Sequence, residues 1–320
     1  MIKILLDKYT VENFQQKDLK TIFKIRQEIS RQDGIDPQST LETTPSRKNF
    51  EKSLEAKNTN PLKDIFVIKK DGEAVGYCQA GYWSEEGDIK VYIHHIFLLK
   101  KHRLPKLLQG VLSFIEDHLK SISTQHVSKN KYFATNTSES ENEKLSLLQI
   151  NGYKNVWQMV EMKFNNFTKL PELTIPESFK LKPVIKSDYK DIYLANKEVY
   201  SGKWGSKPVS DDEFNQFLED FDTLNTVWTV AWRGSEVAGF VISIIKNDYT
   251  VIDEVSVRKQ FRKQGLGKYL LVENIKQAHK RGAKTIRLHT DSKDQGNGLT
   301  LYNKLGFTSI KEHFRLRKPF

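Results

Sequence analysis

The amino-acid sequence repeats one set of landmarks in its two halves, and this repetition constrains the fold more than any other feature. Residues 70–77 (KDGEAVGY) resemble residues 233–240 (RGSEVAGF), and both stretches lie between runs of β-forming side chains. Two runs of β-forming residues joined by a glycine-containing turn predict a β-hairpin, and the sequence contains this pattern twice. Each hairpin is followed by another strand and then by a helical apolar pattern, at residues 107–119 and 266–278. We therefore expect two copies of one domain.

A polar stretch containing two prolines separates the copies at residues 165–178. We place the boundary near residue 170, which gives a first domain over residues 1–170 and a second over residues 171–320. Each copy has the coarse order strand, one or two helices, strand meander, helix, strand, helix, strand. A meander combined with helices that flank a later strand predicts an α/β fold, of the α+β kind with a mixed sheet, in each domain.

The charge balance favours an anionic partner. Lys and Arg outnumber Asp and Glu by 51 to 40, which gives a net charge of +11. Nucleic acid, an acidic membrane surface and a phosphate-rich cofactor would all fit this excess. The positive residues are spread along the chain instead of being gathered in one arm, so nucleic acid is the least expected of these partners.

Several classes of protein and site are not expected from this sequence. No apolar run approaches the ~18 residues of a membrane span, and the N-terminus does not resemble a signal peptide, so we expect a cytoplasmic protein without a membrane partner. The single cysteine, Cys78, rules out an intramolecular disulfide. The pair His94-His95 lacks metal-ligand spacing and is interpreted as part of a strand, so no metal site is expected.

A glycine-bearing loop, residues 262–268 (RKQGLGK), follows the strand predicted at residues 251–257 and opens a helix. Glycines let a backbone approach a ligand closely, and free N–H groups at a helix N-terminus attract negative charge. This arrangement would hold a pyrophosphate, with five nearby Lys and Arg side chains adding positive charge. An ordinary strand–turn–helix connection with a solvated basic face is the alternative, and the loop by itself leaves both open.

A second motif, residues 301–307 (LYNKLGF), closes the second copy. The two motifs together resemble the GNAT superfamily of acyl-CoA-dependent N-acyltransferases. Its pattern [QR]xxGx[GA] is met by Arg262, Gly265 and Gly267, and its pattern LYxKxGF is met within residues 301–307. The resemblance implies two tandem GNAT-like domains, as in two-domain proteins of the mycothiol synthase type.

The resemblance also implies where acetyl-CoA would bind as cosubstrate. In the family the glycine loop holds the pyrophosphate of coenzyme A, the preceding strand pairs with the pantetheine arm, and the motif tyrosine lies near the thioester sulfur. The implied cofactor contacts are Val255, Ser256, Val257, Arg262, Lys263, Gln264, Gly265, Leu266, Gly267, Lys268 and Asn297. The family often has Asn seven residues before the tyrosine; this chain has Gln295 there, and Asn297 comes two residues later.

The first copy departs from both patterns. Aligned on Arg103, its loop reads RLPKLL, so Lys106 and Leu108 replace the two glycines, and Leu148 replaces the motif tyrosine. Bulkier side chains would crowd a backbone that must meet a pyrophosphate. We therefore interpret the first domain as degenerate, and expect it to serve structure or substrate shaping.

Acyl transfer to an amine needs a base for the ammonium and an acid for the leaving thiolate. Asp253 and Glu254 on the strand before the loop are the candidate bases, and Tyr302 is the candidate acid. Strict alternation along a strand predicts that Glu254 shares a face with Ile252 and Ser256 while Asp253 faces the opposite side. The alternative is that the two acids only bridge nearby lysines.

The expected acceptor is a primary amine of a small molecule or peptide. Residues 209–222 contain six acids and no Lys or Arg, which would attract a cation, although a solvated helix capped by Ser210 is the favoured explanation. Two other functions remain open at this stage. One is a non-catalytic acyl-CoA-binding or sensing protein, and the other is an RNA- or ribosome-associated protein.

Overall fold

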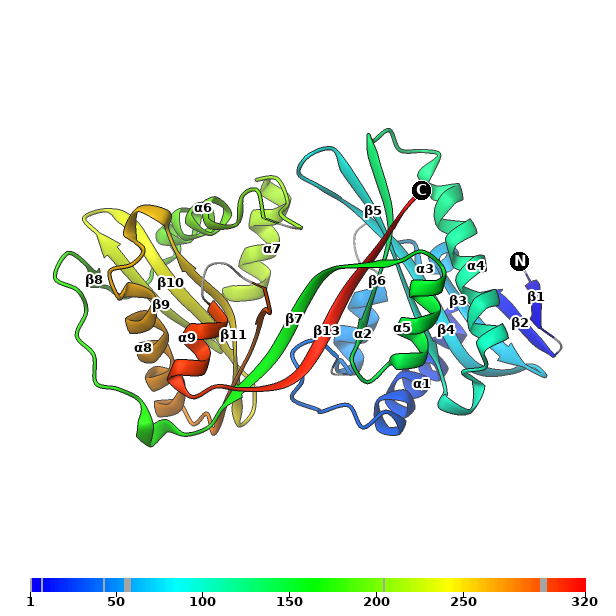
Figure 1. Cartoon of the computed structure of the whole chain (residues 1–320), viewed down its shortest axis with the longest axis horizontal. Coiled ribbons are helices and arrows are strands. Elements are labelled where there is room, and N and C mark those ends of the chain that lie inside the picture. Colours follow the sequence, from blue (N-terminus) through cyan, green and yellow to red (C-terminus); the bar gives the residue numbers. More distant parts are fainter. Residues whose placement is uncertain (1, 7, 43, 55–58, 204, 294–297) are drawn as a thin grey trace. The chain divides into compact units, whose positions relative to one another are not determined.

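The computed structural model describes residues 2–6, 8–42, 44–54, 59–203, 205–293 and 298–320. The chain forms two compact units, which are treated separately below (Figure 1). Unit 1 comprises residues 1–158 and 312–320, and unit 2 comprises residues 159–311. The chain therefore leaves unit 1 once and returns to it for its last nine residues. Among the described residues, no helix has both the length and the apolarity needed to cross a bilayer.

Unit 1 is a mixed sheet with helices on both faces. Its helices are α1 (Leu19–Gln32), α2 (Arg47–Leu54), α3 (Pro61–Asp64), α4 (Pro105–Ser123) and α5 (Asn142–Ile150). Its strands are β1 (Ile2–Leu6), β2 (Tyr9–Asn13), β3 (Ile65–Lys70), β4 (Glu73–Glu85), β5 (Ile89–Leu98), β6 (Asn130–Ser138), the start of β7 (Lys154–Phe164) and the end of β13 (Thr308–Pro319). The described sheet order runs β1-β2-β3-β4-β5-β6-β13, and the β5–β6 pair is parallel.

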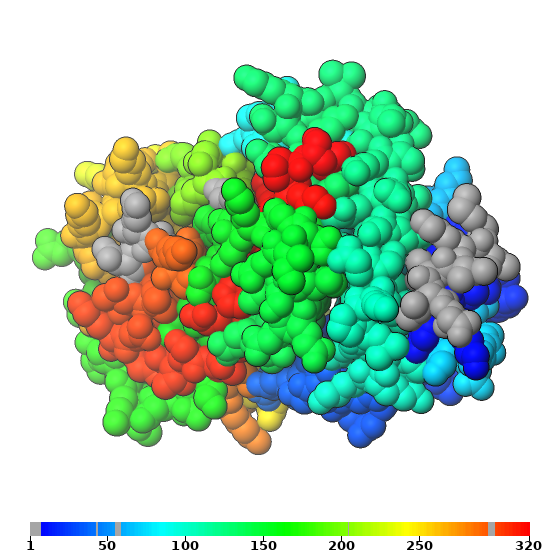
Figure 2. All heavy atoms as spheres, turned by 45° about the vertical axis from the view of Figure 1, so that its right-hand side comes forward, coloured from blue at the N-terminus to red at the C-terminus, as the bar shows by residue number. Residues whose placement is uncertain are grey.

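The core of unit 1 has two layers, one on each face of the sheet. On one face Tyr92, Phe133 and Leu316 pack against α4 and α5. On the other face Tyr77 and Phe97 pack against α1 and α2. The last strand belongs to this core, because residues 313–319 pair with β6, and Figure 2 shows the end of the chain, in red, lying among atoms of unit 1.

Unit 2 repeats this plan (Figure 1). Its helices are α6 (Tyr189–Tyr200), α7 (Asp211–Phe221), α8 (Leu266–Lys280) and α9 (Gly298–Leu305). Its strands are the end of β7, β8 (Lys180–Leu181), β9 (Thr226–Arg233), β10 (Glu236–Ile245), β11 (Tyr249–Val257), β12 (Thr285–Asp291) and the start of β13. The described residues of the two units also form short 3-10 turns: η1 (Gln16–Asp18), η2 (Lys100–His102), η3 (Phe167–Lys169), η4 (Lys186–Asp188) and η5 (Lys259–Phe261). The sheet order is β7-β12-β11-β10-β9-β8, with β11 and β12 parallel. The predicted fold class, an α/β fold with mixed sheets, is confirmed.

The two predicted hairpins are present as β3–β4 and β9–β10. Their turns need a left-handed backbone, which Asp71 (φ 49°) and Gly72 (φ 86°) supply in the first and Gly234 (φ 61°) supplies in the second. Asp and Gly are among the residues that adopt this conformation at the lowest cost. The turn chemistry is local, which is why the sequence predicted it.

The parallel strands separate part-way along their length in both units. Pairing of β5 with β6 ends at Ile93 and Ala134, although both strands continue for four or more residues. Pairing of β11 with β12 ends at Val251 and Arg287, and both strands again continue. Each unit therefore has an opening in its sheet, between two diverging strands.

A β-bulge at Asp253 corrects the expected alternation along β11. Glu254 pairs with Ile242 on β10, but the next pair is Ile252 with Ser243, which leaves Asp253 as an extra residue. The extra residue shifts the phase of the strand, so Ile252 packs in the same core layer as Val255 instead of sharing a face with Glu254. The β4–β5 ladder of unit 1 runs without such a shift.

Candidate active site

The glycine loop, residues 262–268, connects η5 to α8 in unit 2. Gly265 is the N-cap of α8 with φ 81°, and Lys263 is also left-handed with φ 61°. Leu266 is buried in the core of unit 2 and anchors the loop, whereas residues 262–265 are exposed. The Arg262 Nε donates to the Val257 carbonyl oxygen at 2.9 Å, which ties the loop to the end of β11.

The geometry of the loop suits a bound pyrophosphate. No side chain caps α8, so the N–H groups of its first turn have no side-chain acceptor at the cap. A Cβ placed on Gly265 would meet nothing within 4 Å, so the space above this glycine is open. A Cβ on Gly267 would lie 3.4 Å from the Val257 Cγ2, so this glycine lets α8 approach β11. Free N–H groups beside open space form an anion site.

Four of the five expected cations are exposed on this surface. Lys259, Arg262, Lys263 and Lys268 are exposed. Arg258 instead forms ion pairs with Glu198, at 2.6 Å, and with Glu236. Its charge is therefore offset by two carboxylates and adds little to the field at the loop.

Glu254 lies on β11 beside the opening of the sheet, on the face covered by α6. Burial raises the pKa of its carboxyl group to about 7, and the nearby charge of Asp253 adds to the rise. The polar side chains of Asn196 and Tyr200 lie close to this carboxyl group and act on its pKa in the opposite direction. A carboxyl group with a pKa close to neutral can accept and release protons at physiological pH.

Four polar side chains gather here, and we call them the polar cluster: Asn196, Tyr200, Glu254 and Ser256. Asn196 and Tyr200 stand four residues apart on α6, so they project from one side of the helix toward β11. Burial raises the pKa of the Tyr200 hydroxyl, and the nearby Glu254 and Tyr302 raise it further. Within the described part of the chain, three buried atoms of the cluster lack a hydrogen-bond partner: Asn196 Nδ2, Glu254 Oε2 and Ser256 Oγ.

Buried polar atoms without partners are costly, at about 1–3 kcal/mol each, and in native proteins they are uncommon. Three of them together, beside an opening in the sheet, indicate a site whose remaining hydrogen bonds are made by a ligand. No role for Asn196 was expected from the sequence. The only signal for Asn196 was its i,i+4 spacing from Tyr200 on an otherwise apolar helix face.

The remaining predicted site residues lie in different surroundings. Tyr302 on α9 is buried, and its ring packs edge-on against Phe307 with a centroid distance of 5.7 Å. Asp253 is exposed at the bulge, where Asp220 is one of its charged neighbours. Asn297 lies outside the described residues.

Comparison with known sequences identifies a stretch within the second half of the chain. The pattern of the acetyltransferase (GNAT) family matches residues 189–307. This stretch is a GNAT acetyltransferase domain. It contains the glycine loop, the polar cluster and Tyr302, and the family resemblance drawn from the two motifs is confirmed.

Two curated relatives support the assignment. An uncharacterized N-acetyltransferase, YvbK, of Bacillus subtilis (strain 168) is 37% identical over 90 residues, which cover 27% of this chain and 57% of that protein. A mycothiol acetyltransferase of Pseudarthrobacter chlorophenolicus is 28% identical over 167 residues, which cover 49% of this chain and 51% of that protein. The chain thus spans about half the length of the curated relatives it matches.

Solved structures extend the likeness in fold to the whole chain. A GCN5-related N-acetyltransferase from Sphaerobacter thermophilus superposes with a TM-score of 0.77 at 17% identity, covering 99% of this chain and 97% of that one. A tandem GNAT protein from the clavulanic acid biosynthesis pathway has a TM-score of 0.69 at 11% identity, covering 97% and 98%. The likeness in fold therefore covers both units.

The acids around the start of α7 are explained by helix capping and ion pairing. The Ser210 side chain caps α7 and accepts a hydrogen bond from the Glu213 N–H at 3.2 Å, as predicted. The Glu213 carboxylate pairs with Lys197 and Lys207, at 3.5 and 3.1 Å. Lysines from neighbouring segments thus neutralise part of the negative charge of this GNAT domain.

Proposed function

We propose that the protein is an N-acetyltransferase that moves an acetyl, or more generally an acyl, group from acetyl-CoA to a primary amine of a small-molecule or peptide acceptor. The observation that supports it best is Glu254: a carboxyl group with a pKa raised to about 7, and a carboxylate oxygen without a partner, on the strand that leads to the glycine loop. A group poised in this way suits proton removal from an alkylammonium, whose pKa is near ~10.

The glycine loop would hold the pyrophosphate of acetyl-CoA through the backbone N–H groups of residues 263–268. The exposed side chains of Lys263 and Lys268 would neutralise phosphate charge. The free edge of β11 at Val255, Ser256 and Val257, beyond the last pair with β12, leaves room for a polar arm to pair with the strand. The unpaired Ser256 hydroxyl would find its partner there.

In the proposed reaction, Glu254 accepts a proton from the substrate ammonium. The amine nitrogen then bonds to the thioester carbonyl carbon, and the carbon–sulfur bond breaks. Tyr302 donates its hydroxyl proton to the leaving thiolate, so that the products are an amide and free coenzyme A. We assign the base to Glu254 instead of Asp253 because Glu254 belongs to the polar cluster, whereas Asp253 points to solvent at the bulge.

We assign the acyl-CoA site to the second domain, residues 171–320, and interpret the first domain, residues 1–170, as a degenerate GNAT-like domain. The support lies in the loop of unit 1, where Pro105 occupies the first turn of α4. The counterpart of Tyr302 is Leu148, which is buried in the core and carries no hydroxyl.

The test is release of free thiol from acetyl-CoA in the presence of a panel of small amines and peptides. Acceptor-dependent thiol release, with one acetylated product by mass, would support the proposal. Tight binding of acetyl-CoA without turnover on any amine would favour the alternative, a non-catalytic acyl-CoA-binding protein.

A further inference from the structure

Unit 1 keeps the opening between its parallel strands but changes the charge of the side chains around it. In β5 the pair Leu98–Gly76 corresponds to the pair Val257–Gly239 of unit 2. Three residues before Leu98 stands His95, at the position that Glu254 occupies in unit 2. An acid in one unit is thus replaced by a neutral or basic group in the other.

Three cationic side chains surround His95. The Arg26 guanidinium of α1 lies 4.7 Å from the centroid of the Phe97 ring, which stacks with the His95 ring at 6.1 Å. The Lys144 Nζ of α5 donates to the Asn136 carbonyl oxygen at 3.0 Å.

Arg315 of β13 is the backbone partner of Asn136 in the neighbouring ladder. The side chains of His95, Asn136 and Arg315 project from the face of the sheet that α1 covers, because Tyr92, Phe133 and Leu316 point to the other face. The cations of α1, α5 and β13 therefore converge on one end of the opening.

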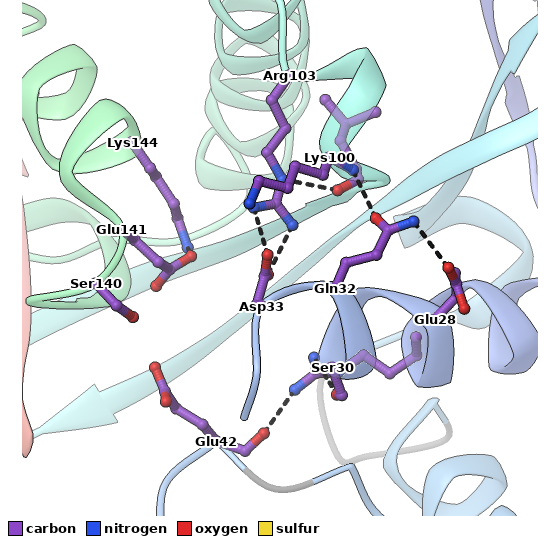
Figure 3. A network of polar contacts seen from close by, with 12 residues as sticks. Glu28, Ser30, Gln32, Asp33, Glu42, Lys100, Arg103, Ser140, Glu141 and Lys144 are labelled. Carbon is purple, nitrogen blue, oxygen red and sulfur yellow. Dashed lines mark hydrogen bonds and ion pairs between the residues drawn. The ribbon is translucent and has the colours of Figure 1, made fainter. Parts of the chain in front are cut away.

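The acids nearby do not neutralise all of this charge. Glu141 pairs with Lys144 at 3.1 Å, and a Glu42 carboxylate oxygen lies 3.9 Å from the His313 Nδ1. Figure 3 shows Glu141 and Lys144 directed toward each other at the start of α5, with Glu42 on the α1 side of the same region. Arg26 donates to the backbone carbonyl oxygen of Glu42, at 3.0 Å, and not to its carboxylate. Among the described residues, neither Arg26 nor Arg315 has a carboxylate partner.

Both arginines are half-buried, and a cation removed from water without a counterion is costly. The positive charges also act on His95. Burial and the charges of Lys144, Arg315 and Arg26 lower its pKa to about 3. Burial also lowers the pKa of Arg315. A bound anion would offset these costs.

We propose that unit 1 binds the carboxylate or phosphate group of a small molecule at the opening between β5 and β6, where Arg26, Lys144 and Arg315 converge. Guanidinium groups suit this role because their planar N–H donors match the oxygens of either anion. The neutral His95 ring supplies one further donor or acceptor. The site is separate from the proposed acyl-CoA site and does not depend on it.

The experiment uses the full chain and two probes, inorganic phosphate and acetate, each compared with chloride at the same ionic strength. Thermal unfolding and calorimetric titration are measured for the wild type, Arg315→Met and Lys144→Met. Lys120→Met, an exposed lysine on α4 of the same unit, is the matched control. An anion that binds the native state raises the unfolding temperature as its concentration exceeds Kd.

We expect at least one probe to stabilise the wild type and Lys120→Met equally, and to bind Arg315→Met and Lys144→Met at least ~10-fold more weakly. Comparison with these variants separates this site from phosphate bound at the glycine loop of unit 2. Which probe binds tells whether the group is a carboxylate or a phosphate. Without probe, Arg315→Met should be as stable as the wild type or more stable, because it removes an unpaired charge.

Two results would overturn the proposal. One is equal stabilisation of all four proteins by each probe, which would show that the anions act elsewhere or through ionic strength alone. The other is a strong loss of stability in probe-free Arg315→Met together with undiminished probe binding by Lys144→Met, which would make the cluster a structural contact.

Discussion

The Arg103 guanidinium donates to both carboxylate oxygens of Asp33, with N–O distances of 2.8 and 2.7 Å (Figure 3). The Arg103 Nε also donates to the Leu98 carbonyl oxygen at 2.9 Å, and the Arg262 Nε makes the same contact with Val257 at 2.9 Å. The motif arginine therefore holds the loop to the preceding strand in both units. In unit 1 an aspartate at the end of α1 also occupies the terminal nitrogens of Arg103, whereas no carboxylate contacts those of Arg262 within the described part of unit 2.

The Arg103–Asp33 pair is expected to stabilise unit 1. Replacing Asp33 with Ala leaves a partly buried guanidinium without its carboxylate, so the free energy of unfolding should fall by about 1–3 kcal/mol. The matched control is Glu28→Ala, which removes the exposed ion pair with Arg31 on the same helix and should lower the free energy of unfolding far less. Chemical denaturation measures both, and equal losses would show that the bidentate pair adds nothing.

Gly265→Ala should weaken coenzyme A binding at least ~10-fold. The substitution puts a Cβ at φ 81°, which costs about 1 kcal/mol, and places it in the open space of the glycine loop. Gly234→Ala carries a similar strain in the β9–β10 turn, at φ 61°, and should leave coenzyme A affinity unchanged. Calorimetric titration of both variants with coenzyme A separates the effect of backbone strain from loss of the binding site. Equal coenzyme A affinities of the two variants would contradict the assignment of the glycine loop as the pyrophosphate site.

The pH dependence of turnover should follow the deprotonation of Glu254. If this group is the base, kcat/KM rises about tenfold per pH unit below pH 7 and levels off above it, because the carboxylate is the active form. Glu254→Gln should lower the rate ~10²-fold or more and remove this limb of the profile.

Glu254 should also make the free energy of unfolding depend on pH. A raised folded-state pKa means that the folded chain keeps a proton that the unfolded chain loses near 4.5. Stability should therefore fall as pH rises from 4.5 through 7, and this fall should be absent from Glu254→Gln. If neither kcat/KM nor the free energy of unfolding of the wild type changed with pH over this range, a raised pKa of Glu254 would be excluded.

Tyr302→Phe should lower kcat ~10²-fold or more while coenzyme A affinity changes little. The substitution keeps the ring that packs against Phe307 and removes only the hydroxyl, so it isolates proton donation to the thiolate. The measurement is steady-state turnover with a confirmed amine acceptor. Wild-type kcat in this variant would remove Tyr302 from the mechanism.

Unit 2 should depend on residues 159–170, which come before the boundary expected from the sequence. The end of β7, from Met159 to Phe164, pairs with β12, and Val160, Met162 and Phe164 are buried in the core of unit 2. Burial of three such side chains stabilises by about 5 kcal/mol or more, which is comparable with the stability of a domain. A chain of residues 159–311 should fold and remain soluble, whereas residues 171–311 should aggregate. Gel filtration compares the two, and a folded, monomeric 171–311 chain would contradict this.

Local features of this protein were readable from its sequence. Both hairpin turns, the capped start of α7 at Ser210 and the glycine loop depend on residues that are neighbours in the chain, such as Gly265 and Leu266. Repetition of these landmarks then predicted two similar mixed sheets. Each inference rests on backbone preferences that act over a few residues, so no knowledge of distant contacts was needed.

Tertiary structure alone decided which residues meet. The bulge at Asp253 follows from the fit of β11 to β10, and a single extra residue moved Ile252 to the other face of the strand. Asn196 reached Glu254 only because α6 lies over that face. Arg315 lies beside Asn136, to which Lys144 donates, because the final strand pairs with β6, about 180 positions earlier in the chain. Pairing over such separations depends on the whole packed sheet and leaves no periodic signal in either segment.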